Sequence, residues 1–150
     1  QFKDLVRTKP EKKIKKLGEK THISYGFSTY SLGIFRFYAQ QFYEHRKKHI
    51  PKLIGKLIDP LALAVWFMDD GSFKSRHHTT YIIHALGYTR NDLTIVKEVF
   101  ERKFGIKIGI HKQYEKLRIY FMSETADRFK KLVGPHMMPS LKYKLGEHNA

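Results

Sequence analysis

The sequence predicts an α+β fold with antiparallel sheets, and three observations carry the prediction. Apolar and polar residues alternate in short segments, as they do in strands with one buried face. These segments are residues 22–28, 106–112 and 116–121. Stretches with helical periodicity lie between and after them, at residues 32–45, 89–104 and 124–133. Consecutive strands are separated by short turns, which favours hairpins over parallel crossovers.

Composition limits the class of protein and points to an anionic partner. The chain has 150 residues, 41% of them hydrophobic, which is enough for one domain with a core of its own. Its 29 Lys and Arg residues against 14 Asp and Glu give a net charge of +15, and nucleic acid is the leading polyanionic partner. A membrane surface fits less well, because the basic residues are spread over strands and loops instead of one amphipathic helix.

Cysteine is absent from the sequence, which excludes disulfides and thiolate metal sites. The longest apolar run, residues 61–68, is too short to span a bilayer, and no secretory signal is visible. These features predict an intracellular protein. They do not distinguish a mitochondrion, a chloroplast and a prokaryotic cytoplasm.

The first part of the chain predicts the end of a helix, a hairpin and a second helix. Residues 1–7 are interpreted as a helix tail that Pro10 prevents from continuing. Strands over residues 12–17 and 22–28 pair around Gly18, and a helix follows over residues 32–45. A basic cluster at residues 46–49 comes after that helix.

The segment that carries most chemistry is a helix over residues 60–70, apolar for eight residues and ending in Asp69 and Asp70. Because residues 61–68 are apolar on every side, we expect this helix to be buried all round. Two carboxylates at a helix C-terminus oppose the macrodipole, so they indicate a bound cation. Gly71 is expected to end the helix in a left-handed conformation.

The pattern after this helix continues to the end of the chain. Strands are predicted over residues 72–76 and 79–85. Thr89 and Asp92 predict a capping box that opens the next helix, and Gly105 ends it. The order helix, strand, strand, helix, strand, strand, helix (αββαββα) therefore follows residue 59, and the strand, strand, helix (ββα) order before it is the remainder of a second such unit.

The outward face of the late strands is basic and carries no carboxylate. An exposed strand face is usually polar for solvation alone, but a consistently positive face favours contacts with phosphates and base edges. The nucleic-acid-binding candidates are Lys13, Lys15, His22, Ser24, Ser28, Lys74, Arg76, His84, Lys107, His111, Lys116, Arg118 and Tyr120. The adjacent His77 and His78 are interpreted as surface or DNA-facing residues, since neighbours in a strand point to opposite faces.

These motifs together resemble the LAGLIDADG homing endonucleases. Residues 63–71, Leu-Ala-Val-Trp-Phe-Met-Asp-Asp-Gly, align with the nine-letter signature of the family and with the second motif of intron-encoded members. Further matching segments occur in the family's order along nearly the whole chain. They are Lys48 with Ile50 and Pro51, residues 103–106, and Pro139 with residues 143–145.

The resemblance implies a site-specific endonuclease that hydrolyses double-stranded DNA with Mg²⁺, Mn²⁺ being able to substitute. Two motif helices pack together in the family, each delivers one acid, and two β-saddles grip the DNA. Asp70 matches the catalytic metal-binding acid, with Gly71 beside it, and Lys48 and Lys144 match basic residues near the scissile phosphates. Asp69 ranks lower.

One motif helix is missing from the pattern. The resemblance therefore divides the chain into residues 1–58, the later part of a first half-domain, and residues 59–150, a complete second half-domain. An upstream segment or a second chain is expected to supply the other motif helix. Leu86 and Ser28 also stand where relatives often have Gln.

A non-catalytic alternative remains open. An intron-splicing maturase that grips structured RNA would use a similar basic surface, because phosphates dominate both kinds of contact. A sequence-specific repressor explains the basic sheet but leaves the acid-ended helix without a role, so it ranks last.

Overall fold

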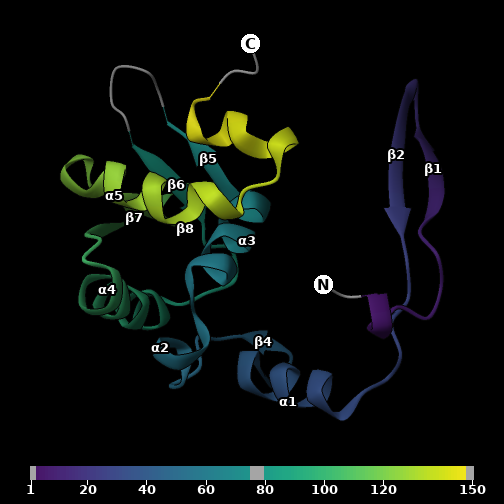
Figure 1. Ribbon diagram of the computed structural model, residues 1–150, viewed down its shortest axis with the longest axis horizontal. Helices are drawn as coiled ribbons and strands as arrows, with labels where there is room; N and C mark the ends of the chain where they lie inside the picture. Colours follow the sequence, from purple (N-terminus) through teal and green to yellow (C-terminus); the bar gives the residue numbers. More distant parts are fainter. Residues whose placement is uncertain (1–2, 75–79, 148–150) are drawn as a thin grey trace. The chain divides into compact units, whose positions relative to one another are not determined.

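The computed structural model describes residues 3–74 and 80–147 (Figure 1). The chain forms two compact units, residues 1–40 and residues 41–150, which are described separately below. No helix among the described residues is long and apolar enough to cross a membrane.

The first unit is built on a hairpin. Strand β1 (Glu11–Leu17) pairs antiparallel with β2 (Lys20–Gly26), and Gly18 makes the turn with a φ of 58°. The predicted hairpin is confirmed. The predicted helix tail at residues 1–7 is wrong for the described part, where Lys3–Leu5 form a short 3-10 turn (η1).

The two faces of this hairpin differ as the alternation predicts, but neither face is buried. Ile14 lies opposite Ile23 on one face, while Lys15 lies opposite His22 on the other. Ile23 is nevertheless 56% exposed. No described residue of positions 3–40 reaches full burial, so this hairpin lacks a covering layer within the unit.

Helix α1 (Gly33–Phe42) ends three residues before the predicted end, which is corrected here. The next residues form a small hairpin of β3 (Tyr43–Glu44) and β4 (Lys47–Lys48) instead. Its turn needs positive φ at His45 and Arg46, 47° and 65°, a conformation typical of two-residue hairpin turns and strained for side chains of this kind. The basic cluster is therefore held on a tight hairpin.

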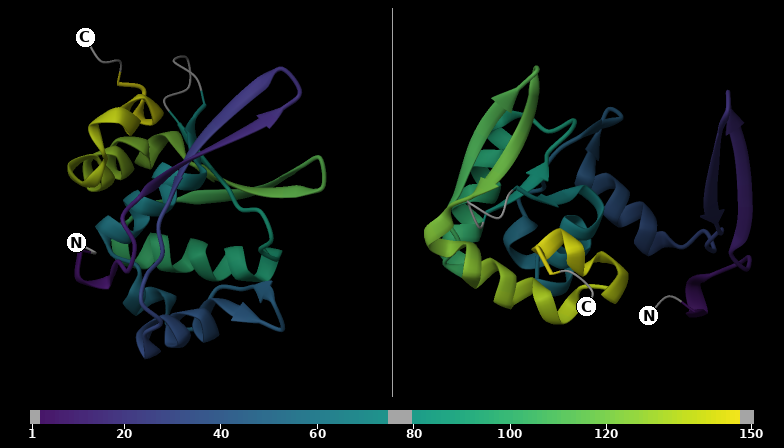
Figure 2. Two further views of the ribbon diagram at one scale, coloured as in Figure 1. Left: turned by 90° about the vertical axis from the view of Figure 1, so that its right-hand side faces the viewer. Right: turned by 90° about the horizontal axis from the view of Figure 1, so that it is seen from above.

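The second unit places helices on one face of an antiparallel sheet (Figures 1 and 2). The four strands lie in the order β5-β6-β8-β7. Their bounds are β5 Gly71–Phe73, β6 Tyr81–His84, β7 Ile108–Gln113 and β8 Lys116–Phe121. The helices and turns are α2 Ile54–Leu57, α3 Pro60–Asp70, α4 Arg90–Phe104, α5 Ser123–Val133, η2 Gly134–His136 and η3 Pro139–Leu145. The αββαββα order is thus present from α3 to α5.

The core of this unit joins the inner face of the sheet to α3, α4 and α5. Phe67 of α3 packs against Tyr81 and Phe129, with ring centroids 5.7 and 5.0 Å away. Phe100 and Phe121 continue this aromatic layer, with ring centroids 6.1 Å apart. All five side chains are at most 1% exposed.

Several element predictions are confirmed and others need adjustment. Thr89 and Asp92 form the predicted capping box at the start of α4, and Gly105 ends that helix in the left-handed conformation with φ 62°. Strands β5, β6 and β7 are displaced or shorter than predicted, and α2 was not predicted. The interpretations of Arg76, His77 and His78 lie outside the described residues.

Helix α3 is not buried all round, contrary to the prediction. Leu63, Ala64 and Phe67 are fully buried in this unit, but Val65 is 53% exposed and Ala62 and Asp69 are exposed as well. These three positions recur at helical spacing and define an open face of α3. The open face consists of Ala62, Val65 and Asp69.

Gly71 is also used differently from the prediction. Its φ is −89° and its ψ is 156°, so it is extended and begins β5 instead of forming a left-handed cap. A Cβ at this position would overlap the ring and the carbonyl oxygen of Phe67. Glycine is therefore required here for the close approach of the chain to α3.

Candidate nuclease centre and nucleic-acid face

Helix α3 is built to deliver Asp70 to the start of the sheet. The Asp59 carboxylate accepts a hydrogen bond of 2.7 Å from the Ala62 N–H, and Pro60 occupies the first turn, so the helix start is well defined. The helix ends at Asp70, directly before β5. Asp70 is half-buried and Asp69 is exposed. The acid identified from the sequence thus lies where the motif helix meets the sheet.

Lys144 brings positive charge to the end of α3 from 75 residues away in sequence. Its Nζ donates to the Met68 carbonyl at 2.6 Å and to the Asp69 carbonyl at 3.2 Å. A cation at a helix C-terminus stabilises the last carbonyls and opposes the negative end of the dipole. The sequence places no basic residue in the last turn of α3, and η3 supplies one through the tertiary fold.

A row of the predicted site residues crosses the sheet from this point. Gly71 of β5 pairs with Ile83 of β6. His84, the next residue of β6, therefore lies beside Asp70, the residue that precedes β5. His84 pairs with Arg118 of β8, and Arg118 pairs with His111 of β7. The candidates predicted on three separate strands therefore lie side by side.

The electrostatic surroundings of His84 include both the acid and its basic neighbours. Burial lowers the pKa of the His84 imidazole, and the charges of Arg118 and Lys144 lower it further, while Asp70 acts in the opposite direction. The neutral form of His84 is therefore favoured. The four groups, Asp70, His84, Arg118 and Lys144, form one electrostatic cluster.

Lys48 approaches this region from β4. Its Nζ lies 6.0 Å from the centroid of the Tyr88 ring, and Tyr88 packs edge-on against Trp66 of α3 at 6.2 Å. Burial raises the pKa of the Tyr88 hydroxyl, with smaller contributions from Tyr43 and Asp70. Sequence reasoning missed Tyr88. The signal for it was its place directly before the N-cap Thr89, where an apolar residue often packs on its own helix.

Asp92 fixes the backbone that follows Lys48. Its carboxylate accepts a hydrogen bond of 2.9 Å from the Ile50 N–H, and two more from the Thr89 N–H and hydroxyl at 2.8 and 2.6 Å. Burial opposes ionisation of Asp92, but these hydrogen bonds outweigh it and hold the pKa of the carboxyl below its ordinary value of 3.8. The helix cap of α4 thereby anchors the loop after β4.

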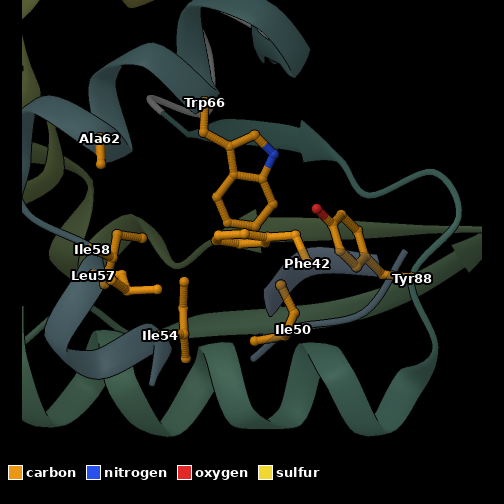
Figure 3. A pocket seen from close by; sticks show the side chains of 8 residues that line it. All are labelled: Phe42, Ile50, Ile54, Leu57, Ile58, Ala62, Trp66 and Tyr88. Carbon is orange, nitrogen blue, oxygen red and sulfur yellow. The ribbon is translucent and has the colours of Figure 1, made fainter. Parts of the chain in front are cut away.

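An apolar cavity of about 180 Å³ is bordered by Trp66 and Tyr88 (Figure 3). It is lined by Phe42, Ile50, Ile54, Leu57, Ile58, Ala62, Trp66 and Tyr88. None of these side chains is a metal ligand. The described part of the chain also contains no cluster of three or more His, Cys, Asp or Glu side chains.

The remaining sequence candidates fall on two sheets in the two units. Lys13, Lys15, His22 and Ser24 share one face of the β1–β2 hairpin, as the register shows. Ser28 lies after β2, where its N–H donates to the Thr8 hydroxyl at 2.8 Å. The other described candidates lie on or next to the four-stranded sheet of the second unit. They are Lys74, His84, Lys107, His111, Lys116, Arg118 and Tyr120. Lys107 also forms an exposed ion pair of 3.2 Å with Glu124.

Comparison with known proteins assigns these features to a family. The sequence model of the LAGLIDADG DNA endonuclease family matches residues 1–129, a range that includes Lys48 and Asp70 but stops before Lys144. The chain belongs to the LAGLIDADG DNA endonuclease family. The fold is accordingly the α+β architecture with antiparallel sheets of these enzymes, and members of the family generally depend on divalent metal ions.

Individual relatives include both endonucleases and a maturase. The chain is 33% identical over 126 residues to intron-encoded endonuclease ai4 of Dictyostelium discoideum, covering 81% of this chain and 77% of the relative. It is 30% identical over 124 residues to cytochrome b mRNA maturase bI2 of Debaryomyces hansenii, covering 81% of this chain but 46% of the maturase. The solved structure of homing endonuclease I-WcaI bound to its DNA recognition sequence matches with a TM-score of 0.88 and 26% identity, covering 99% of this chain and 68% of that one.

Proposed function

We propose that this protein is a site-specific homing endonuclease that hydrolyses both strands of a duplex DNA target. The observation that carries the proposal is the Asp70 carboxylate at the end of α3, next to the row of His84 and Arg118 on the basic sheet face. A phosphate held by such a face would be brought next to the acid. The family membership supports the same chemistry.

The open face of α3 supports a second motif helix in the working enzyme. Ala62, Val65 and Asp69 leave a largely apolar strip exposed on a helix whose other faces are packed in the core. A second helix on this strip would bring its own acid near Asp70. An upstream segment or a second chain would supply that helix, with residues 1–58 belonging to the first half-domain and residues 59–150 forming the second.

The donor set around Asp70 fits a Mg²⁺ ion shared with another acid. A carboxylate is the hard oxygen ligand that Mg²⁺ prefers, and this ion is commonly held by one or two carboxylates together with phosphate oxygens and water. No hydrogen bond or ion pair among the described residues occupies the Asp70 carboxylate, and the Gly71 backbone lies beside it. Asp70 and Gly71 would hold the ion, with Mn²⁺ able to replace it. When bound, the ion would activate water and stabilise the leaving oxygen.

The two lysines would act differently from each other. Lys48 is exposed on β4 and directs its ammonium toward the Tyr88 ring, so it remains free to approach a phosphate and offset its developing charge. Lys144 is engaged with the Met68 and Asp69 carbonyls. Its role would be to hold the end of α3, and with it Asp70, while adding positive charge to the site.

The alternative is an RNA-binding, intron-splicing maturase on the same scaffold. The 30% identity to a cytochrome b mRNA maturase favours it. Both functions would use the basic sheet faces, because contacts to phosphates dominate each of them. The half-buried Asp70 and its electrostatic cluster have a role in the endonuclease and none in the maturase, which is why we favour the endonuclease.

The proposal is tested with the full native polypeptide and a library of random DNA duplexes in Mg²⁺. Sequencing of the cut ends should reveal one enriched target, with both strands cut, and EDTA should abolish the products. Structured intron RNA added as a competitor separates the two functions. Absence of cleavage at every Mg²⁺ and Mn²⁺ concentration, together with RNA binding that outcompetes duplex DNA, would contradict the endonuclease and favour the maturase.

A further inference from the structure

We propose that Lys74, Tyr120 and His111 form a single base-reading cluster whose geometry is set by Gly109, and that it recognises the major-groove edge of a guanine. The proposal rests on the proposed DNA-binding function and assigns a specificity element within it. The cluster lies on the outward face of the second sheet, away from the face that packs on the helices.

The three side chains converge from different strands. Tyr120 lies on β8, His111 on the neighbouring edge strand β7, and Lys74 directly after the opposite edge strand β5. The Lys74 Nζ lies 5.4 Å from the centroid of the Tyr120 ring, within the range of a cation–π contact. The His111 ring meets the same tyrosine edge-on, with centroids 4.6 Å apart. Tyr120 is therefore held between two groups that can donate hydrogen bonds.

Gly109 makes this arrangement possible. It lies directly opposite Tyr120 in the β7–β8 register. A Cβ at position 109 would come within 2.9 Å of the His111 Nε2 and 2.9 Å of the Met122 Cε. The missing side chain leaves the space in which the His111 imidazole lies back against Tyr120. Gly109 is thus a positioning residue for His111.

The floor beneath the cluster is apolar and closely covered. Ile82 pairs with Tyr120 on its other side and alternates with Ile83, which belongs to the helix-packed core. Ile82 is only 8% exposed although it lies outside that core, so side chains of the outward face cover it. Tyr120, the cross-strand partner of Ile82, is itself half-buried, whereas Lys74 is exposed. The Lys74 ammonium therefore stays accessible to a ligand.

A groove of about 460 Å³ opens beside these residues. Its lining includes Lys74, Thr80, His111, Tyr120, Met122 and Ser123. The Thr80 hydroxyl is buried and has no hydrogen-bond partner among the described residues. The groove therefore combines the aromatic ring of Tyr120 with side chains that can donate hydrogen bonds.

The donor chemistry selects guanine among the bases. Guanine presents two acceptors, N7 and O6, in the major groove, whereas adenine presents one acceptor and a donor, and thymine one acceptor and a methyl group. The Lys74 ammonium can only donate, so a pair of acceptors suits it best. A phosphate would also accept from Lys74, but it would not need the fixed Tyr120 and His111 beside it.

The test is selection of bound sequences from a random duplex library, which requires no cleavage. Wild type is compared with Lys74→Met, His111→Ala and Gly109→Ala, and with Lys116→Ala as the matched control from the same sheet face. Gly109→Ala removes no donor, and the atoms it would touch are the ends of flexible side chains, so the fold is retained. Equal melting temperatures by circular dichroism verify this.

The proposal predicts that the three cluster variants lose about tenfold of guanine preference at the same base pair, within the range typical of a single base contact. Lys116→Ala should weaken binding equally for all sequences. It should also reduce the slope of log affinity against log salt concentration by the amount expected for about one phosphate contact. Uniform weakening by the cluster variants, or Gly109→Ala with an unchanged preference, would overturn the cluster. Wild type that enriches no DNA sequence would overturn the proposed function and the cluster together.

Discussion

Two hairpins of this chain, β1–β2 and β7–β8, have the same alternating pattern and opposite burial. Ile23 on the apolar face of the first is 56% exposed, whereas Ile119 on the apolar face of the second is fully buried. The second hairpin belongs to a sheet covered by α3, α4 and α5, and the first unit contains no such helix layer among its described residues. Alternation therefore specifies which face is apolar, but a covering element is needed to bury it.

The same contrast occurs within the single helix α3. Ala64 is fully buried in the second unit, while the adjacent Val65 is 53% exposed. Both residues belong to one apolar run, so hydrophobicity alone does not tell which side meets this unit's core. The difference leaves an open face on α3, which is where we propose that the second motif helix packs.

The largest expected effect compares the covered and uncovered regions directly. Phe67→Ala should lower the free energy of unfolding by about 3–5 kcal/mol, because it leaves a cavity in the aromatic core. Ile23→Ala should cost less than about 0.5 kcal/mol, since that side chain is mostly exposed. Urea denaturation followed by circular dichroism measures both. Equal costs would mean that the face of β1–β2 is already covered.

A smaller loss is expected at the junction of α3 and β5. Gly71→Ala should cost about 2 kcal/mol in urea denaturation, because the new methyl group overlaps the Phe67 ring and backbone. Gly134→Ala is the matched control, since a Cβ there meets nothing within 4 Å and the backbone is helical. That control should be neutral or slightly stabilising. A neutral Gly71→Ala would contradict the close approach.

Asp92→Asn should cost about 2 kcal/mol at neutral pH, because the amide cannot accept all three hydrogen bonds from Ile50 and Thr89. The sign of the pH dependence follows from the lowered pKa. The contribution of ionised Asp92 is complete above the ordinary carboxyl pKa of 3.8 and is lost as the pH falls through the lower value of the folded state. The difference between wild type and variant should therefore shrink below about pH 4. A constant difference down to pH 2 would contradict this assignment.

The smallest effect on stability is expected at the open face of α3. Val65→Lys should change the free energy of unfolding by less than about 0.5 kcal/mol, because the side chain is already half in solvent. It should nevertheless abolish cleavage by the native enzyme, since a lysine ammonium would be buried against the second motif helix. Trp66 is the single tryptophan in the sequence and follows Val65 on α3, so its fluorescence reports whether the variant is folded. Full cleavage by the variant would argue against helix packing at this face.

Sequence reasoning reached most of the second unit because its signals are local. The Thr89 and Asp92 capping box, the left-handed Gly105 and the β7–β8 hairpin depend on neighbouring residues, and all are present. The role of Gly71 was not predictable, because its constraint comes from the Phe67 ring and backbone rather than from its own turn. The end of α1 was not predicted because no local signal marks it. The basic run after the helix contains no Gly or Asn, yet it forms a tight turn at His45 and Arg46.

The residue types of the candidate site could be predicted from the sequence, but most contacts between those residues could not. The signature identified Asp70, and strand alternation placed Arg118 and His111 on the outward face of the predicted second hairpin. Three contacts join residues that lie 40 to 76 positions apart in the sequence. They are the hydrogen bonds from Lys144 to the end of α3, the position of Tyr88 beside Lys48 and the anchoring of Ile50 by Asp92. Such contacts depend on the tertiary fold and leave no periodic signal.

We propose Asp70 as the acid that this chain contributes to a DNA-cleaving centre. The most direct measurement is single-turnover cleavage of the selected duplex in Mg²⁺ by Asp70→Asn and by its neighbour Asp69→Asn, with DNA affinity measured in parallel. We expect Asp70→Asn to bind the duplex without cutting it and Asp69→Asn to retain cleavage. Cleavage by Asp70→Asn at the wild-type rate would show that Asp70 is not the catalytic acid.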